Sequence, residues 1–301
     1  MLILDIGNSA IKATDGERET LTPSVVGEAQ QVWTDQQLWQ VNGQFIGADA
    51  ITYGKFVDYS LRERKSDQRT LSTLVEYNLC LYPLEKEIVF LLPFLNFHEE
   101  KATLIEMFNK PHFIKYQVGD QNGARAFLPK MVNALPQGFV AGMDWLLDEN
   151  GVERDKKVLS KNILIVDIGF LTVNYIFLSR GKVVQNKSFS SLNGMHIIYD
   201  RITAETGQNI YEIDLVNSKA SLSPLYASLS RVIQTDIESH YRLSDIGLYL
   251  MCGGGSEPTF DHIPYENKIL HGDVFSNARG GRKVANRLWG IEPGHSEAMA
   301  N

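Results

Sequence analysis

The sequence predicts a two-domain α/β protein built around a strand–turn–strand unit that occurs twice. The first copy reads LILDIGNSAIK over residues 2–12, and the second reads ILIVDIGFLTVNY over residues 163–175. In each copy an apolar strand runs into Asp-Ile-Gly and a second alternating strand, and a turn pair follows, Asp15-Gly16 or Arg180-Gly181. Strands and helices alternate along the rest of the chain, which is typical of an α/β sheet. A chain of 301 residues is long enough for two such domains.

The composition is that of a globular protein and argues against several function classes. Hydrophobic residues make up 44% of the chain and charged residues 22%. The net charge of −7, without a long basic run, argues against direct binding of nucleic acid. The seven histidines and two cysteines lack the spacing of metal ligands, so zinc chemistry is not supported. The start of the chain has no signal-peptide pattern and no apolar run approaches the roughly 18 residues of a membrane span, so we expect a cytoplasmic protein.

The repeated unit contains the residue types that a phosphate and metal site requires. A strand that ends in Asp presents a carboxylate at the edge of a sheet, and the next Gly permits a tight turn whose backbone N–H groups can approach an anion. Two such turns facing each other could hold a polyphosphate, with Asp5 and Asp167 left to organise a divalent cation. A single copy would more simply be an ordinary hairpin, so the repetition is what favours a ligand site.

The first half contains a hairpin, two helices and two further strands. Residues 30–50 alternate in the manner of strands, with a turn at Asn42-Gly43. Residues 62–67 form a charged stretch, which predicts a solvated loop. The helix that follows would bury one face, made of Leu71, Leu74, Val75 and Leu79.

A buried strand is then predicted over residues 87–93, followed by a helix that Asn96 would cap and by a strand over residues 113–118. The corner Pro136-Gln137-Gly138 joins a strand end to another helix. A polar loop over residues 149–161 precedes the second copy. We therefore expect domain I over residues 1–150, with a small outer lobe over about 30–80, and domain II over residues 151–275.

The second half repeats this organisation. One helix would bury Met195, Ile198, Tyr199 and Ile202 and end at Gly207, and a second would begin with Ser223 as its N-cap and Pro224 in its first turn. A buried strand then ends in Gly253-Gly254-Gly255. This run is either a plain flexible turn or a place where backbone passes close under a phosphorylated or planar ligand. The last predicted helix, over residues 276–290, would return to domain I.

Together, and in this order, these stretches resemble the motifs of the actin-like ATPases, in particular the bacterial plasmid- and phage-borne branch typified by the ParM segregation proteins. Residues 5–12 resemble the first phosphate motif of that family and residues 167–172 the second. The other similar stretches are residues 41–50 (an early strand pair), 135–138 (the first connecting segment), 253–255 (the adenosine motif) and 275–280 (an "ANARG" stretch).

The resemblance implies a duplicated, ribonuclease H-like fold of two domains with a nucleotide cleft between them. Asp5 and Asp167 would hold Mg²⁺, and Gln137 would orient the attacking water, so these three residues would be catalytic. Lys12 would stabilise charge on the phosphates. ATP would be the nucleotide, with GTP as the other candidate. The residues implied to bind it are Gly7, Asn8, Ser9, Lys12, Gly169, Phe170, Leu171, Thr172, Gly253, Gly254 and Gly255.

Three residues leave alternatives open. Without the resemblance, Lys12 would be an exposed hairpin lysine and Gln137 a plain corner residue. Asn174 stands where an Asp is common in the family, and a missing carboxylate there would weaken the metal shell or slow hydrolysis.

The resemblance further implies an ATPase that assembles into nucleotide-dependent filaments for plasmid DNA segregation. Its partners would be its own copies and a DNA-binding adapter protein. A small-molecule kinase of the same superfold, similar to pantothenate or sugar kinases, is the alternative. Gln137 favours the filament-forming ATPase, since a kinase would need a carboxylate base near a substrate hydroxyl, for which Asp144 is the candidate.

Overall fold

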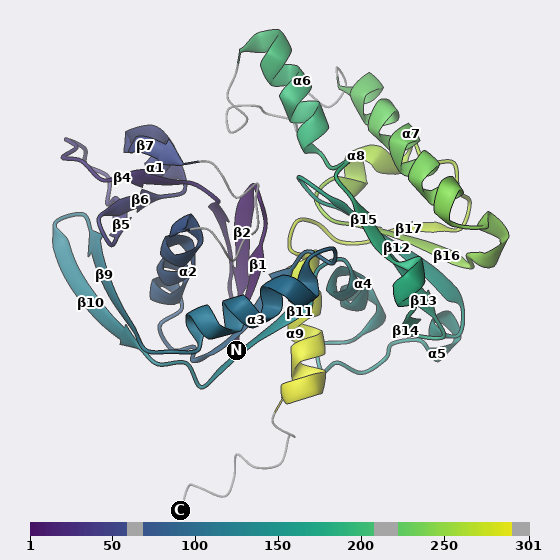
Figure 1. Cartoon of the computed structure of the whole chain (residues 1–301), viewed down its shortest axis with the longest axis horizontal. Helices are drawn as coiled ribbons and strands as arrows, with labels where there is room; N and C mark the ends of the chain where they lie inside the picture. Colours follow the sequence, from purple (N-terminus) through teal and green to yellow (C-terminus); the bar gives the residue numbers. More distant parts are fainter. Residues whose placement is uncertain (59–68, 208–221, 291–301) are drawn as a thin grey trace, which may run out of the picture.

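The computed structural model describes residues 1–58, 69–207 and 222–290, which form three β-sheets and the helices around them (Figure 1). The predicted charged loop at residues 62–67 lies outside this part of the chain. The first sheet has the strand order β11 (Met131–Pro136), β8 (Glu87–Leu92), β1 (Leu2–Ile6), β2 (Ala10–Thr14), β3 (Glu19–Pro23). The third sheet has the order β14 (Lys182–Val183), β13 (Val173–Ser179), β12 (Asn162–Ile168), β16 (Leu248–Cys252), β17 (Lys268–Leu270), with β15 (Phe189–Ser191) also paired to β13.

The second sheet belongs to a small lobe, several of whose buried residues share one core cluster with the first sheet. Its order is β10 (Gln121–Phe127), β9 (His112–Val118), β5 (Trp39–Val41), β6 (Gln44–Ile46), β4 (Val26–Glu28), β7 (Lys55–Asp58). The predicted Asn42-Gly43 hairpin is confirmed, since Asn42 (φ 50°) and Gly43 (φ 78°) join β5 to β6. Strand character does not extend over all of residues 30–50, because residues 30–38 contain no strand and a short helix follows Gly47. The lobe also takes in β9 and β10, which lie beyond the range of about 30–80 expected for it.

The helices are α1 (Ala48–Tyr53), α2 (Arg69–Leu81), α3 (Phe97–Phe108), α4 (Phe139–Leu146), α5 (Lys156–Leu159), α6 (His196–Thr206), α7 (Ser223–His240), α8 (Ser256–Phe260) and α9 (Ser276–Trp289). Short 3₁₀ helices cover Gln185–Lys187 and Leu243–Asp245. None of the helices in residues 1–58, 69–207 and 222–290 has the length and apolar content to span a bilayer.

The first and third sheets share one topology. In each, the strand that ends in Asp pairs antiparallel with the strand after the turn and parallel with a later strand: β1 with β2 and β8, β12 with β13 and β16. The registers also match, since Asp5 lies opposite Lys12 and Asp167 lies opposite Asn174. The repeat in the sequence is therefore a repeat of the fold.

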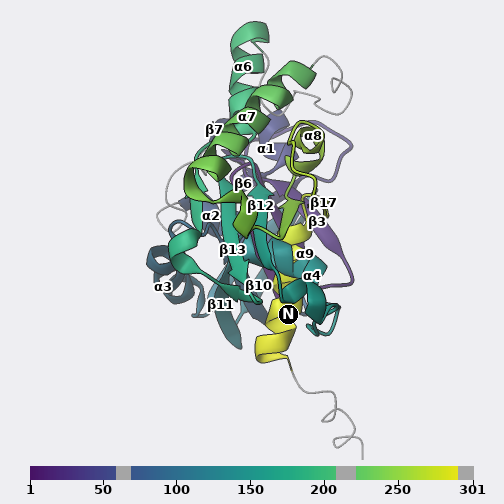
Figure 2. The ribbon, with the colours of Figure 1, turned by 90° about the vertical axis from the view of Figure 1, so that its right-hand side faces the viewer.

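Strand alternation divides the core into layers. Even-numbered residues of β1 and β12, such as Leu4 and Val166, pack on the outer layers formed by α2 with α3 and by α6 with α7. Odd-numbered residues, such as Ile3 and Ile165, share one central cluster with residues of α4 and α9. Asp5 and Asp167 have the odd parity, so both carboxylates point toward the region between the two sheets. Figure 1 shows α4 and α9 between the two halves of the molecule. In the turned view of Figure 2, α6 lies at the top of the molecule and α9 toward the bottom.

Most predicted helices are confirmed, and two of the predicted caps are wrong. The predicted face of α2 is fully buried, and α6 ends at Gly207 in the left-handed conformation (φ 74°). Helix α3 does start after Asn96, but the Asn96 side chain makes no capping hydrogen bond. Ser223 is not an N-cap, because Leu222 takes that place with near-helical angles (φ −94°, ψ −4°) and Ser223 is the first helical residue. The polar loop before the second copy contains α5, whose N-cap Asp155 accepts from the N–H groups of Lys157 and Val158.

Candidate functional site

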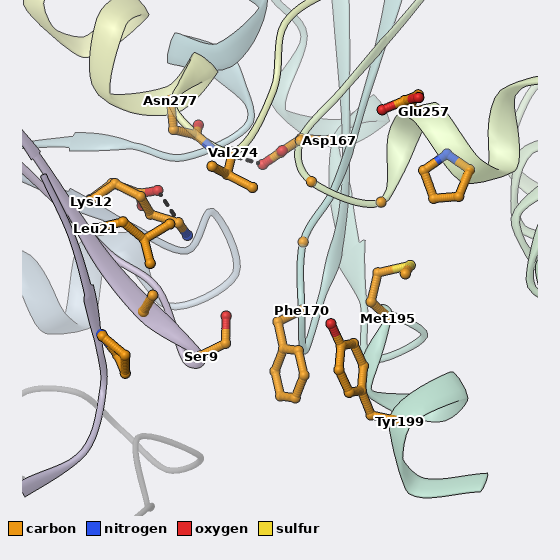
Figure 3. A pocket seen from close by; sticks show the side chains of 18 of the residues that line it. Ser9, Lys12, Leu21, Asp167, Phe170, Met195, Tyr199, Glu257, Val274 and Asn277 are labelled. Carbon is orange, nitrogen blue, oxygen red and sulfur yellow. Dashed lines mark hydrogen bonds and ion pairs between the residues drawn. The ribbon is translucent and has the colours of Figure 1, made fainter. Parts of the chain in front are cut away.

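A cavity of about 510 Å³ lies between the two Asp-Ile-Gly turns (Figure 3). This volume falls in the range of roughly 300–1,000 Å³ typical of small-molecule sites. One wall comes from the first sheet: Asp5, Ser9, Ala10, Lys12, Leu21 and Pro23. The other wall comes from the second half of the chain: Asp167, Gly169, Phe170, Met195, Tyr199, Tyr226, Gly253, Gly254, Gly255, Glu257, Pro258, Val274 and Asn277.

Asp5 is the centre of the first wall. It ends β1 with only 2% of its surface exposed, and Lys12 from the paired strand places its Nζ 3.4 Å from Asp5 Oδ2. The side-chain nitrogen of Gln137 donates to Asp5 Oδ1 and, at 3.2 Å, to the Leu91 carbonyl. The corner after β11 thus places Gln137 directly beside Asp5. Gln137 itself does not line the cavity.

Asp167 is the centre of the second wall, and its partners are neutral. Asn174 Nδ2 donates to Asp167 Oδ2 at 3.1 Å, and Asn277 Nδ2 donates to the same oxygen at 3.2 Å. Burial raises the pKa of Asp167, and the charge of Asp5 raises it further, while the two amide donors and Lys12 act in the opposite direction. The other oxygen, Oδ1, is buried without a hydrogen-bond partner.

The carbonyl groups of the two turns that follow Asp5 and Asp167 accept hydrogen bonds from neighbouring segments of the chain. In the first turn, Ser24 donates from its Oγ to the Gly7 carbonyl (2.8 Å) and from its N–H to the Ser9 carbonyl (2.9 Å). In the second turn, the carbonyls of Gly169, Phe170 and Leu171 accept from the N–H groups at the start of α6, at 3.0, 2.7 and 3.2 Å. The carbonyl edge of this loop is therefore fixed against the segment 194–196.

Two of the three glycines after β16, Gly253 and Gly255, are required by close packing against the second turn. Gly253 has φ +85°, and a Cβ there would lie 2.5 Å from Asp167 Oδ1. A Cβ on Gly255 would lie 2.5 Å from Ile168 Cγ2. The backbone of β16 can pass under the Asp167 carboxylate only because these side chains are missing.

The structure places the predicted site residues in one region but not all on the cavity surface. The predicted residues that line the cavity are Asp5, Ser9, Lys12, Asp167, Gly169, Phe170, Gly253, Gly254 and Gly255. Gly7, Asn8, Leu171 and Thr172 lie in the same two turns without lining the cavity. A Cβ on Gly7 would lie 2.6 Å from Lys12 Nζ, so Gly7 makes room for the lysine.

The sequence predicts Phe170 as a site residue but neither Tyr199, which completes an aromatic wall, nor Asn277 of α9. Phe170 packs edge-on against Tyr199 with ring centroids 5.4 Å apart, and Figure 3 shows these two rings beside Met195 and across from Ser9. The sequence predicts Met195 and Tyr199 only as part of a buried helix face. Met195 is buried and Tyr199 is half-buried, and both also line the cavity. Asn277 lies in the predicted final helix and in the stretch 275–280 that resembles a family motif, but the sequence assigns it no role in the site.

The residues present fit a magnesium ion held together with phosphate oxygens. Mg²⁺ prefers oxygen ligands and is usually bound by one or two carboxylates plus substrate phosphates and water. Asp5 and Asp167 are two such carboxylates at one cavity, and Asp167 Oδ1 is a buried oxygen without a partner. No group of three acidic, histidine or cysteine side chains that could hold a metal alone occurs among residues 1–58, 69–207 and 222–290.

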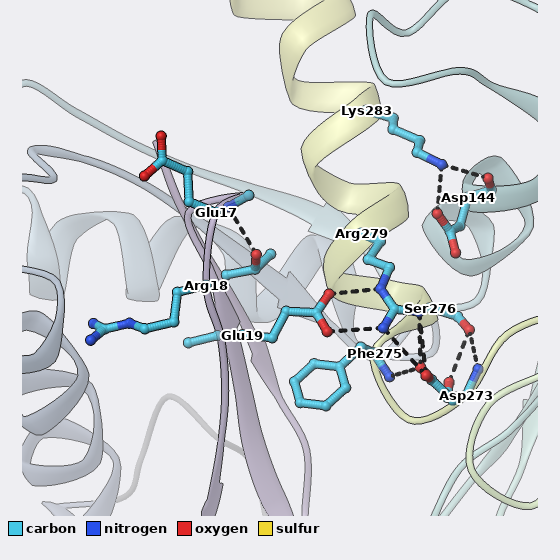
Figure 4. Close-up of polar contacts among 12 residues, drawn as sticks. Glu17, Arg18, Glu19, Asp144, Asp273, Phe275, Ser276, Arg279 and Lys283 are labelled. Carbon is cyan, nitrogen blue, oxygen red and sulfur yellow. Dashed lines mark hydrogen bonds and ion pairs between the residues drawn. The ribbon is translucent and has the colours of Figure 1, made fainter.

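Asp144 does not have the environment of a general base. It is buried in α4, and its carboxylate binds Lys283 Nζ (2.8 Å) and His271 Nε2 (2.9 Å). Burial acts to raise the pKa of Asp144, but the bonds from His271 and Lys283 outweigh it, so that this pKa is lowered. Figure 4 shows this cluster beside a second one, in which Arg279 of α9 binds both Glu19 and Asp273. Both clusters join α9 to its neighbours outside the cavity.

Comparisons with known proteins agree with this architecture. The family described as actin-like proteins, N-terminal domain, matches residues 4–139. No curated protein sequence matches the chain.

Several solved structures are similar over nearly the whole chain. A crystal structure of apo pSK41 ParM protein is 21% identical, with a TM-score of 0.73, and the match covers 95% of this chain and 97% of that one. A 15-stranded ParM filament from Clostridium botulinum is 18% identical, with a TM-score of 0.74 and 95% and 99% covered. An archaeal actin homologue in complex with ADP is 18% identical, with a TM-score of 0.75 and 95% and 100% covered. The fold predicted from the motifs is confirmed: residues 4–139 match the model of the actin-like N-terminal domain, and the chain as a whole has the actin-like fold.

Proposed function

We propose that the chain binds ATP with Mg²⁺ in this cavity, hydrolyses it, and assembles with its own copies into nucleotide-dependent filaments. The observation that carries the proposal is the pair Asp5 and Asp167, which end equivalent strands of a duplicated fold and face one cavity from opposite walls. Lys12 adds the cation that a phosphate group requires, 3.4 Å from one of the two carboxylates. The similar ParM filament and the ADP complex of the archaeal homologue support the same activity.

The phosphates would lie between the two turns. Backbone N–H groups of residues 7–9 and 169–172 would donate to them, and Lys12 would stabilise charge that develops during cleavage. Asp5 and Asp167 are the protein groups that would hold a Mg²⁺ ion, which would supply positive charge to the phosphates. Asp5 and Leu91 hold the side-chain nitrogen of Gln137, so its carbonyl oxygen is the atom that would orient the attacking water.

The nucleoside would lie over the glycine run and against the aromatic wall. Gly253, Gly254 and Gly255 present backbone without side chains, which suits a ribose or α-phosphate. Phe170 and Tyr199 present ring surfaces to the same cavity and would contact the nucleobase or sugar. ATP is proposed over GTP because the similar archaeal actin homologue was crystallised with ADP.

The filaments would serve plasmid DNA segregation in the cytoplasm, with a DNA-binding adapter protein as the second partner. We keep domain I as residues 1–150 with the returning helix 276–290, and domain II as residues 151–275. Nucleotide between the domains would bias their closure and thereby the affinity between subunits, and by linkage assembly would bias nucleotide binding equally.

A kinase on this fold is not favoured. The one acidic side chain considered as its base, Asp144, lies outside the cavity lining and is paired with Lys283 and His271. A base with a lowered pKa and no access to a substrate hydroxyl could not take its proton.

Light scattering at a right angle, recorded together with phosphate release, tests the proposal. Purified protein at micromolar concentration should scatter more within seconds to minutes of adding ATP and Mg²⁺, and phosphate release should follow. Asp167→Ala should abolish release, whereas Asp35→Ala, which removes an exposed carboxylate far along the chain from either turn, should not. A protein that neither binds ATP nor scatters would exclude the proposal. Release that requires a hydroxyl-bearing acceptor would establish a kinase instead.

A further inference from the structure

Asn277 connects the two walls of the cavity through both ends of its side-chain amide. It is the second residue of α9 and only 9% exposed. Its Oδ1 accepts from the N–H of Gly138 at 2.9 Å, and its Nδ2 donates to Asp167 Oδ2 at 3.2 Å. Gly138 follows Gln137, whose side chain binds Asp5. A continuous polar path therefore runs from Asp5 through the Gln137 corner and Asn277 to Asp167.

The orientation of the Asn277 amide is fixed by its partners. A backbone N–H can only donate, so the side-chain oxygen must face Gly138, and a carboxylate can only accept, so the nitrogen must face Asp167. Gly138 has little freedom to move away, because a Cβ there would lie 2.8 Å from Asn174 Cβ and its φ is +75°. The corner, Asn174, Asp167 and Asn277 thus form one packed group.

We infer that Asn277 is a positioning residue for hydrolysis, which sets Gln137 relative to the Asp167 carboxylate. This inference rests on the proposed function, since it assigns Gln137 to the attacking water and Asp167 to the magnesium ion. Nucleotide binding alone does not need the coupling, because the phosphate contacts come from the two turns themselves. Asn277 therefore acts on the hydrolysis rate much more than on nucleotide affinity.

Asn174 provides the matched comparison. It also donates to Asp167 Oδ2, and its own Oδ1 accepts from Ser190 Oγ, but the Gly138 N–H is bonded to Asn277 instead. Asn174→Ala keeps the Cβ that packs on Gly138 and removes only the amide. The two substitutions thus remove the same kind of bond to Asp167, and only Asn277→Ala also frees the corner.

Hydrogen exchange of the Gly138 amide tests the connection without nucleotide. Asn277→Ala should speed this exchange roughly tenfold, because it removes the only side-chain acceptor recorded for that N–H in the described chain. Asn174→Ala should change it less than about twofold. Asp167→Ala should speed it by a smaller factor than Asn277→Ala, and only while Asn277 is present. An exchange rate of the Gly138 amide that is unchanged in Asn277→Ala would overturn the inference.

Turnover tests the role in hydrolysis through a double-mutant cycle. Asn277→Ala should lower the rate at saturating ATP and Mg²⁺ roughly 10- to 100-fold, with the Kd for ADP changed less than about threefold. In the Gln137→Ala background the same substitution should cost less than about twofold, whereas Asn174→Ala and Gln137→Ala should combine additively. Additive effects of Asn277→Ala and Gln137→Ala would show that Asn277 does not act through the corner.

Two further variants separate a folding defect from the proposed role. Asn277→Asp keeps the acceptor for Gly138 but places a carboxylate against Asp167, so it should retain the slow exchange at Gly138 and still lose turnover. Asn286→Ala, on the same helix, removes a side chain that donates to the Glu149 carbonyl at 3.3 Å and should leave both readouts unchanged. If the unmodified protein does not hydrolyse ATP, the proposed function fails, and the exchange cycle still decides whether Asn277 couples Gly138 to Asp167.

Discussion

The two copies of the strand–turn–strand unit share their geometry and differ in their charges. Each places an Asp at the end of a central strand, and each has a polar residue seven positions later directly across the hairpin. In the first copy that residue is Lys12, which brings a cation to Asp5. In the second it is Asn174, a neutral amide, and Asn277 supplies another.

Because of this difference, the two equivalent carboxylates have different surroundings: a cation beside Asp5 and neutral amides beside Asp167. The first copy pairs its carboxylate with a charge that can also serve a phosphate. The second copy holds one oxygen of its carboxylate with amides and leaves the other oxygen buried and unpaired. Backbone duplication therefore fixed where the two carboxylates lie, and the cross-strand residue decides what each can do.

Making the first copy resemble the second should have the largest effect. Lys12→Asn removes the only cation that the described residues place within ion-pair distance of Asp5. We expect ATP turnover to fall roughly 100- to 1,000-fold, the loss typical when a preorganised charge is removed from a reacting group. Phosphate release at saturating ATP measures it, with Lys182→Asn on the exposed edge strand β14 as the control. Unchanged turnover would return Lys12 to the role of an ordinary hairpin lysine.

A third buried carboxylate, Asp144, sharpens the comparison because its pKa moves in the opposite direction from that of Asp167. Asp144 accepts hydrogen bonds from His271 and Lys283 and has a lowered pKa, so its stabilising contribution is present above the unfolded pKa, about 3.9, and is lost as pH falls through the folded value. Asp167 has a raised pKa, caused first by burial, so its contribution is present at low pH and lost as pH rises through the folded value.

Neutralising these two carboxylates should therefore change stability with opposite sign. At pH 7, Asp144→Asn should lower the free energy of unfolding by about 3 kcal/mol, because the buried Lys283 loses its buried carboxylate partner and keeps only the exposed Glu149 carboxylate, at 3.1 Å, among the described residues. Asp167→Asn should raise it by about 1 kcal/mol, at the expense of activity. Urea unfolding from pH 2 to pH 8 measures both, and the deficit of Asp144→Asn should shrink only below about pH 4. A lower free energy of unfolding in both variants at pH 7 would contradict the opposite pKa shifts assigned to Asp144 and Asp167.

The sequence predicts those parts of the site that depend on local pattern. Alternation of apolar residues locates β1 and β12, and the Asp-Ile-Gly turns place Asp5 and Asp167 at their ends, because strand parity and turn chemistry act over a few residues. The same is true of the glycine run after β16.

The residues that were missed depend on contacts between distant segments. Tyr199 and Tyr226 have the composition of a helix core, and only the packing of α6 and α7 beside the second turn brings part of their rings to the cavity. Asn277 lies 110 positions from Asp167 in the chain, and no pattern within one helix encodes that bond. The false cap at Ser223 has a local cause, since Ser-Pro favours a helix start but does not decide which residue takes the non-helical position.

The two turn glycines offer the last and smallest contrast between the copies. A Cβ on Gly7 would lie 2.4 Å from the Ala10 carbonyl oxygen and 2.6 Å from Lys12 Nζ, whereas a Cβ on Gly169 would meet only the Thr172 carbonyl oxygen, at 3.0 Å. Gly7→Ala should therefore cost about 2 kcal/mol of stability and displace Lys12, while Gly169→Ala should cost less than about 1 kcal/mol. Urea unfolding of the two variants measures the difference in their free energies of unfolding. Gly43→Ala would not serve as a control, because its positive φ would add backbone strain of its own. Equal costs would mean that the first turn yields as easily as the second, and that Lys12 is not held in place by the tightness of its own turn.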